Sequence, residues 1–116
     1  MRKRVLIVDD HQPFRTTARE LLEEAGYVVA GEAADAAEAR AAVAAGRPDA
    51  VLLDVQLPDE DGFAVATALT ADGGPAIVLI SSRDAEDYGR RIETCGARGF
   101  IPKSKLSAAA FAALVD

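Results

Sequence analysis

The chain has 116 residues, which suits one compact domain, and half of them are hydrophobic, enough for a sizeable core. Its formal net charge of −6 argues against nonspecific binding to nucleic acid or to an anionic membrane, because such binding needs clustered lysine and arginine. No apolar stretch approaches the roughly 20 residues of a membrane span, and the basic start of the chain leads into an apolar run too short for a signal peptide. The single cysteine, Cys95, excludes an internal disulfide and is interpreted as a helix-packing residue. We therefore expect one cytoplasmic domain over 1–116 and no further domain after Asp116.

The first half of the chain alternates short apolar runs with helical patterns, which is typical of βαβ units and a parallel sheet. Glycine and proline end the patterns, and an aspartate precedes one of them as a helix cap. In chain order we expect a strand over 4–8, a helix that begins near Pro13 and ends at Gly26, a strand over 27–33, a helix capped by Asp35 and closed by Gly46 and Pro48, and a strand over 50–53.

The second half continues the same alternation. We expect a helix over 63–71 that stops at Asp72-Gly73-Gly74-Pro75, a strand over 76–81, a helix from Asp84 to Thr94, a strand over 97–101 and a last helix over 108–115. A glycine inside a helix costs roughly 1 kcal/mol relative to alanine. Because Gly89 lies in the middle of the predicted helix over 84–94, that helix is a candidate mobile element.

Charged residues directly follow three of the apolar runs. Asp9 and Asp10 follow the first run, Asp54 follows the third, and Lys103 follows the last. The carboxyl ends of parallel strands line one crevice, so these side chains are predicted to share a small site. Two carboxylates about 4 Å apart repel by roughly 4 kcal/mol at an effective dielectric constant of about 20. A hard divalent cation such as Mg²⁺ would relieve that repulsion.

The ordered set of motifs resembles the receiver domain of two-component response regulators over essentially the whole chain. The matching motifs are Asp9-Asp10, Asp54-Val55-Gln56-Leu57-Pro58 with Asp61-Gly62, Ser81-Ser82, and Phe100 three residues before Lys103. Residues 29–35 and 99–104 are similar to the subfamily that often carries a C-terminal helix-turn-helix. The resemblance implies an α/β fold with a single doubly wound, five-stranded parallel sheet, flavodoxin-like, with helices on both faces.

The resemblance also implies a role for individual residues. It implies that Asp54 accepts a phosphoryl group, that Lys103 pairs with the phosphoryl oxygens and that Ser81 hydrogen-bonds them. The implied Mg²⁺ ligands are Asp10 and Asp54 directly, Asp9 largely through water, and the backbone carbonyl of Gln56. The implied switch residues are Ser81 and the aromatic Phe100, and the implied positions that tune dephosphorylation are Gln56 and Arg83.

The resemblance further implies a signalling module rather than an enzyme with a separate substrate. Its partners would be a sensor histidine kinase and a downstream effector or output domain, which in a full-length protein could bind DNA, and a homodimer on phosphorylation stays open. The surface read by partners would be that of the fourth helix, fifth strand and fifth helix. We expect no direct binding of nucleic acid or membrane by this chain.

Two local features bear on these expectations. Many relatives have a proline directly after the lysine, preceded by a cis bond, whereas Ser104 follows Lys103 here, so no cis bond is expected at that place. Pro102 instead precedes the lysine, and proline is tolerated on the edge strand that this segment would form. His11 is interpreted as a loop residue at the rim of the site, because Mg²⁺ prefers oxygen ligands.

The sequence argues against three other functions. A haloacid-dehalogenase-like phosphatase needs an aspartate two residues after the nucleophile, where this chain has Gln56. A flavodoxin-like cofactor binder needs a phosphate-binding loop after the first strand, where Asp9 and Asp10 would repel the phosphate. A receiver-like module without phosphorylation is disfavoured because the expected acidic, hydroxyl and lysine residues are all present, and a phosphorylation assay decides.

Overall fold

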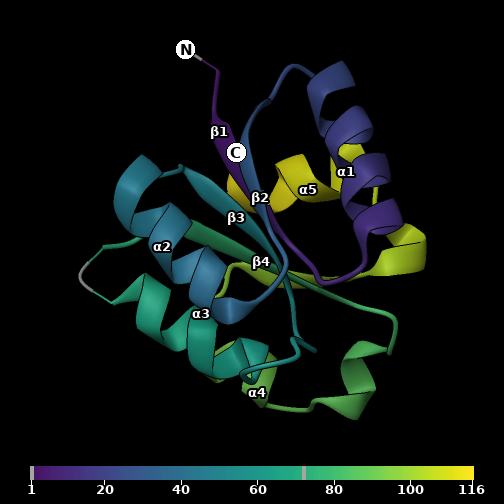
Figure 1. Cartoon of the computed structure of the whole chain (residues 1–116). Coiled ribbons are helices and arrows are strands. Elements are labelled where there is room, and N and C mark those ends of the chain that lie inside the picture. The colour runs from purple at the N-terminus through teal and green to yellow at the C-terminus, as the bar shows by residue number, and fades with distance from the viewer. Residues whose placement is uncertain (1, 72) are drawn as a thin grey trace.

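The computed structural model describes residues 2–71 and 73–116, and it places in them one five-stranded parallel sheet with helices on both faces (Figure 1). The strand order is β2-β1-β3-β4-β5, and every neighbouring pair is parallel. The elements are β1 (Arg4–Val8), α1 (Gln12–Glu24), β2 (Val28–Ala33), α2 (Ala36–Gly46), β3 (Ala50–Asp54), α3 (Gly62–Thr70), β4 (Ala76–Ser81), a 3-10 turn (Ala85–Asp87), α4 (Arg91–Thr94), β5 (Gly99–Pro102), a second 3-10 turn (Lys103–Lys105) and α5 (Ala108–Val115). The predicted doubly wound α/β fold is confirmed.

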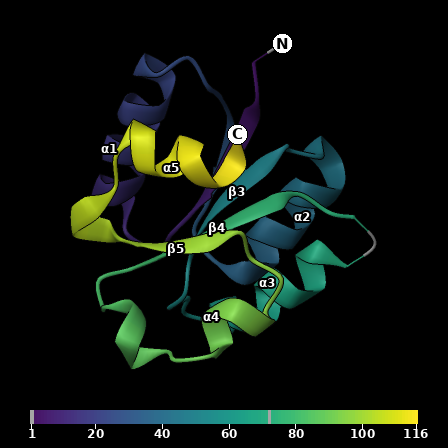
Figure 2. The same ribbon diagram turned by 180° about the vertical axis from the view of Figure 1, so that it is seen from behind.

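The two faces of the sheet are covered by different helices, as opposite views show (Figure 1 and Figure 2). Successive residues of a strand point to opposite faces, and the central strands divide accordingly. On β1, Leu6 and Val8 pack toward α2 and α3, whereas Val5 and Ile7 pack toward α1 and α5. Every residue of β3 is buried. Because both faces are covered, the central strands β3 and β4 are apolar except at their carboxyl ends, where Asp54 and Ser81 lie.

Most predicted elements are confirmed, and their ends differ by one or two residues. β3 includes Asp54 as its last residue, and α3 runs from Gly62 to Thr70. The predicted stop of that helix includes Asp72, which lies outside the described residues. β5 begins at Gly99 and includes Pro102. It is an edge strand, as expected, and the described residues contain no cis peptide bond.

The prediction of one continuous helix over 84–94 is wrong. The segment contains a 3-10 turn over Ala85–Asp87 and then the single helical turn of α4 over Arg91–Thr94. Gly89 separates them with a φ of +57°, in the left-handed region that glycine adopts at little cost. Gly89 therefore interrupts the predicted helix over 84–94 rather than merely weakening it.

No helix among the described residues is long and apolar enough to cross a membrane. The point where the strand order reverses lies between β1 and β3. In open parallel sheets, ligands bind outside the carboxyl ends of the strands at such a point. We therefore expect the functional site among the residues that follow β1 and end β3.

Candidate functional site

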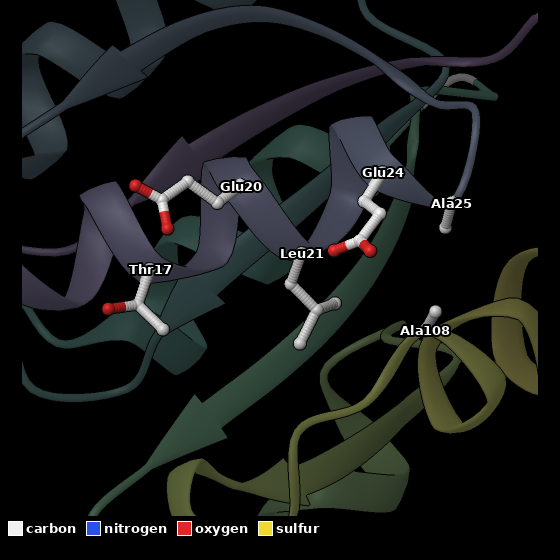
Figure 3. Close-up of a pocket in the computed structure, with 6 residues that line it drawn as sticks. All are labelled: Thr17, Glu20, Leu21, Glu24, Ala25 and Ala108. Carbon is white, nitrogen blue, oxygen red and sulfur yellow. The ribbon is translucent and has the colours of Figure 1, made fainter.

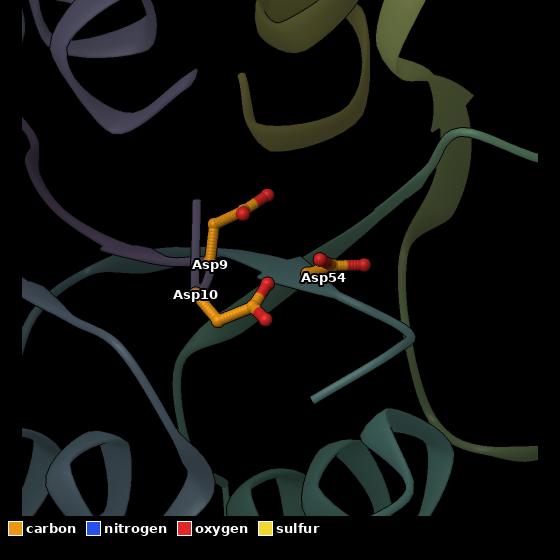
Figure 4. Close-up of side chains that lie close together, drawn as sticks. All are labelled: Asp9, Asp10 and Asp54. Carbon is orange, nitrogen blue, oxygen red and sulfur yellow. The ribbon is translucent and has the colours of Figure 1, made fainter. Parts of the chain in front are cut away.

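An acidic cluster lies at the carboxyl ends of the two central strands (Figure 4). Asp9 and Asp10 follow β1, and Asp54 ends β3. One carboxylate oxygen from each lies within 4.8 Å of the others. Asp9 and Asp54 are buried, with 0% and 4% of their surface exposed, whereas Asp10 is exposed. The predicted convergence of the three carboxylates is thus confirmed, with one of them open to solvent.

Lys103 reaches the same cluster from the edge of the sheet. Its Nζ atom lies 2.6 Å from Asp9 Oδ2 and 3.3 Å from Asp54 Oδ2. The ammonium also lies 4.7 Å from the centre of the Phe14 ring on α1, within the range of a cation–π contact. The contact with Asp9 is a charge contact rather than a directed hydrogen bond, since Asp9 Oδ2 is buried without a hydrogen-bond partner. One ammonium therefore partly offsets two buried carboxylates.

Burial determines the titration of this site. It raises the pKa of the Asp54 carboxyl to about 6, and the charge of Asp9 adds to the increase, while the backbone N–H of Gln56 and the charge of Lys103 act against it. Burial alone would lower the pKa of Lys103, but contact with Asp9 and Asp54 raises it above its usual value. At neutral pH Asp54 is therefore mostly a carboxylate, held there at a cost in free energy.

The donor set suits a divalent cation. Asp9 Oδ1 accepts from the backbone N–H of His11 at 2.8 Å, and Asp54 Oδ1 accepts from that of Gln56 at 3.0 Å. Asp9 and Asp54 therefore each have one carboxylate oxygen fixed by the backbone and another that contacts Lys103. Asp9 Oδ2 is a buried anionic oxygen without a hydrogen bond of good geometry, and the Lys103 ammonium at 2.6 Å is the cation that offsets its charge. A hard cation with oxygen ligands, such as Mg²⁺, fits these groups.

Close packing fixes the loop after Asp54. Gly62 begins α3 against this loop, and its N–H donates to the carbonyl of Val55 at 2.8 Å. A Cβ atom on Gly62 would lie 2.6 Å from the Asp54 carbonyl oxygen and from Val55 Cα, closer than real Cβ contacts. The side chain of Asp61 caps the same helix by accepting from the N–H of Phe63. Gly62 is thus required for the backbone that holds Asp54 and Gln56.

Ser81 lies beside this cluster, but its hydroxyl has other partners. Asp54 is opposite Ile80 in the sheet register, so Ser81 follows directly at the end of β4. Ser81 is fully buried, its Oγ lies 2.6 Å from the hydroxyl of Tyr88, and it accepts from the backbone N–H of Arg83 at 3.0 Å. Sequence reasoning missed Tyr88, because nothing in the sequence signals a contact across an irregular loop.

The remaining predicted site residues lie around the cluster. Gln56 and Arg83 are exposed and flank Asp54 and Ser81. Phe100 on β5 is half-buried and packs near the Tyr88 ring, with the two ring centres 5.7 Å apart. His11 is exposed and lies at the N-cap position of α1 without a side-chain capping hydrogen bond, which agrees with its interpretation as a rim residue.

A separate surface hollow of about 420 Å³ lies between α1 and the start of α5 (Figure 3). It is lined by Thr17, Glu20, Leu21, Glu24, Ala25 and Ala108. It includes none of the three aspartates of the cluster nor Lys103, and it offers two carboxylates without a basic group. The acidic cluster is therefore the better candidate for the functional site.

With this fold and site, the chain belongs to the response regulator receiver domain family, whose model matches residues 5–114. It is a receiver domain, a module of two-component signalling. Receiver domains bind Mg²⁺ at an acidic pocket and interact with histidine kinases and effector domains. The predicted class of protein is thereby confirmed.

Individual relatives agree with this assignment. Protein CcdB from Bacillus subtilis is 37% identical over 101 residues, which are 86% of this chain and 84% of that protein. The transcriptional regulatory protein PdtaR from Mycobacterium tuberculosis is 33% identical over 87% of this chain, which spans only 49% of PdtaR. The signal receiver domain of NarL from Mycobacterium tuberculosis superposes with a TM-score of 0.85 at 34% identity, covering 97% of this chain and 96% of that domain.

Proposed function

We propose that Asp54 is the phosphoacceptor of this receiver domain. The observation that supports this most is a buried carboxylate at the end of a central strand, 3.3 Å from the Lys103 ammonium and beside two further aspartates. A carboxylate in such a place can act as a nucleophile toward a phosphoryl group. Among the described carboxylates, only Asp9 and Asp54 are buried and also contact the Lys103 ammonium. Asp9 is the more enclosed of the two.

The proposed reaction transfers one phosphoryl group from a kinase phosphohistidine or a small acyl phosphate. An oxygen of Asp54 attacks the phosphorus, a new P–O bond forms, and the bond from phosphorus to the donor nitrogen or oxygen breaks. The leaving group keeps the electron pair of that bond: a histidine nitrogen takes up a proton from solvent, whereas the carboxylate of an acyl phosphate leaves as the anion. Because the pKa of Asp54 is about 6, the carboxylate needed for attack is available at neutral pH.

Charge compensation limits such a step, because the phosphoryl group brings negative charge into an already acidic site. Lys103 lies within contact distance of Asp9 and Asp54, and we propose that it pairs with the phosphoryl oxygens. We propose that Mg²⁺ would be held by Asp10, Asp54 and the Gln56 carbonyl, with Asp9 acting through water. When bound, it would supply further positive charge.

The test is the intact mass of the protein after incubation with acetyl phosphate and MgCl₂. The proposal predicts one phosphoryl adduct on the wild type and none on Asp54→Ala or in the presence of a chelator. Asp59→Ala is a matched control, since Asp59 is an exposed carboxylate of the next loop that accepts from the N–H groups of Ala36 and Ala37. An equal adduct on Asp54→Ala would refute the assignment.

We further propose that phosphorylation alters the surface formed by α4, β5 and α5, with Ser81 and Phe100 as switch residues and Gln56 and Arg83 as tuning positions. Because PdtaR is a transcriptional regulator about twice as long as the matched region, we propose an output domain, which could bind DNA, as the effector. A cytoplasmic location, a sensor histidine kinase as phosphoryl donor and a homodimer on phosphorylation belong to the same proposal.

A further inference from the structure

We propose that Tyr88 is a positioning residue for the switch: its hydroxyl holds the Ser81 hydroxyl in a resting hydrogen bond, and the strength of that bond sets how readily Ser81 turns to a phosphoryl group. The inference rests on the proposed phosphorylation of Asp54. It concerns a residue of the irregular segment after β4. The contact that carries it is the 2.6 Å separation of Ser81 Oγ and the Tyr88 hydroxyl oxygen.

The hydrogen-bonding capacity of serine makes the two partners compete. A hydroxyl has one proton to donate and two lone pairs that accept. One lone pair of Ser81 Oγ is used by the N–H of Arg83. Phosphoryl oxygens without a proton only accept, so Ser81 must donate its single proton to reach one. If Ser81 donates to Tyr88, that proton is already in use; if Tyr88 donates, the bond still fixes the Oγ position. In the first case the bond must be broken before Ser81 can donate to a phosphoryl oxygen; in the second it must be broken only if Oγ has to move.

Aromatic packing determines where the Tyr88 hydroxyl lies. The Tyr88 ring packs against two other rings, with its centre 5.3 Å from that of Phe63 and 5.7 Å from that of Phe100. The Arg91 guanidinium lies 4.3 Å above the Phe63 ring and forms an ion pair with Asp61. Such ring pairs contribute beyond their buried area, so both contacts help to hold the Tyr88 ring in place.

The backbone around Tyr88 permits the ring to move. Tyr88 follows the 3-10 turn and precedes Gly89, whose φ is +57°, and neither belongs to a continuous helix. Loss of the Ser81 contact would therefore free a side chain that touches both α3 and β5. A movement of Tyr88 would reach Phe100 and, through the Phe63 ring, Arg91. Tyr88 would thus stabilise the resting position of Ser81. When the hydrogen bond between them is lost, Tyr88 would transmit the change to Phe100 and Arg91.

The composition of the chain supplies a direct probe. The chain contains two tyrosines and no tryptophan, so in Tyr27→Phe the tyrosine fluorescence comes from Tyr88 alone. The proposal predicts that beryllofluoride with MgCl₂, a mimic of the phosphoryl group, changes this fluorescence. It predicts no such change in the Tyr27→Phe, Ser81→Ala double variant. Tyr88 fluorescence that is unchanged, or that changes equally without the Ser81 hydroxyl, would overturn the proposal.

Affinity supplies a second probe. Removal of the resting bond by Tyr88→Phe should tighten beryllofluoride binding about fivefold, the change expected for one ordinary hydrogen bond. In a Ser81→Ala background the same substitution should leave the dissociation constant unchanged. Tyr27→Phe is the matched control, because it removes a hydroxyl that bonds to Asp116 far from the site. Unchanged or weaker binding by Tyr88→Phe would contradict the proposal.

A third measurement uses neither metal nor phosphoryl mimic. Chemical denaturation of the wild type, Tyr88→Phe, Ser81→Ala and the double variant, without MgCl₂, gives the coupling between the two hydroxyls. The resting bond predicts coupling of about fivefold in the unfolding equilibrium constant, and additive effects would overturn it. If the wild type fails to bind beryllofluoride, the proposed phosphorylation fails, whereas this cycle still decides whether the resting bond exists.

Discussion

The two sides of the acidic site differ in how firmly they are held. On one side α1 is a continuous helix of 13 residues with Ala18 and Leu22 fully buried. Its Arg15 and Arg19 form ion pairs with Glu32 of β2 at 2.9 Å and 2.8 Å. On the other side, residues 82–98 form a 3-10 turn and one helical turn, and Cys95 is the only buried residue among them.

This difference indicates which side a phosphoryl group would displace. A local charge change is transmitted through the element that is cheapest to rearrange, and segments with few buried contacts rearrange at the lowest cost. The α1 side supplies Asp9 and Asp10 through a well-packed strand and helix. The segment over 82–98 instead meets the site through the Ser81 hydroxyl and the Tyr88 ring.

The largest expected contrast is in stability. Leu22→Ala removes a fully buried side chain of α1 and should lower the free energy of unfolding by about 2–5 kcal/mol. Ile92→Ala removes the same number of carbon atoms from the one half-buried residue of α4 and should cost at most about 2 kcal/mol. Urea denaturation of both variants measures the contrast. Equal costs would mean that α4 is as firmly packed as α1.

A second prediction concerns the charge at the site itself. Burial raises the pKa of Asp54 from 3.8 to about 6, so ionisation in the folded state costs roughly 3 kcal/mol. The folded state holds this proton more tightly than the unfolded state, so the penalty is absent below about pH 4, grows as the pH rises, and is complete above about pH 6.

Without metal, Asp54→Asn should therefore be more stable than the wild type at pH 7.5, by up to about 3 kcal/mol. Urea denaturation at several pH values in the presence of a chelator measures the difference, which should shrink as the pH falls from 6 to 4. Asp59→Asn, a change at an exposed carboxylate, is the matched control and should show no gain of this size. A variant that is less stable than the wild type at pH 7.5 would contradict the electrostatic account.

The smallest expected effect is at the break in the segment over 82–98. Gly89→Ala places a side chain at a φ of +57°, where open space surrounds the new Cβ, so only the backbone conformation opposes it. The substitution should cost about 1 kcal/mol, and Gly89→Asn less, because asparagine tolerates this conformation. Urea denaturation tests the order. A stabilising Gly89→Ala would indicate that the segment prefers a continuous helix.

The sequence predicted the parts of this molecule that depend on local patterns. Buried strands such as Val51–Leu53 are continuous apolar runs, and charged residues that end parallel strands must meet at one edge of the sheet. The convergence of Asp9, Asp10, Asp54 and Lys103 followed from these two rules, and the structure confirms it. The roles of those residues stay predictions until phosphorylation is measured.

The parts that were missed depend on tertiary contacts. The helical pattern over 84–94 predicted a continuous helix, but so few of its residues are buried that packing does not offset the cost of Gly89 in a helix. The contact of Tyr88 with Ser81 depends on how the broken segment folds back over β4. Only the loop geometry determines that contact, and no spacing rule in the sequence encodes it.

The most direct test of this account is amide hydrogen exchange of the whole chain with MgCl₂, measured with and without beryllofluoride. The account predicts that exchange changes over residues 81–100, where the Ser81–Tyr88 bond is broken, while the buried face of α1 around Ala18 and Leu22 stays as protected as before. Changes confined to the residues beside Asp9, Asp10 and Asp54, or changes of equal size in α1, would contradict it.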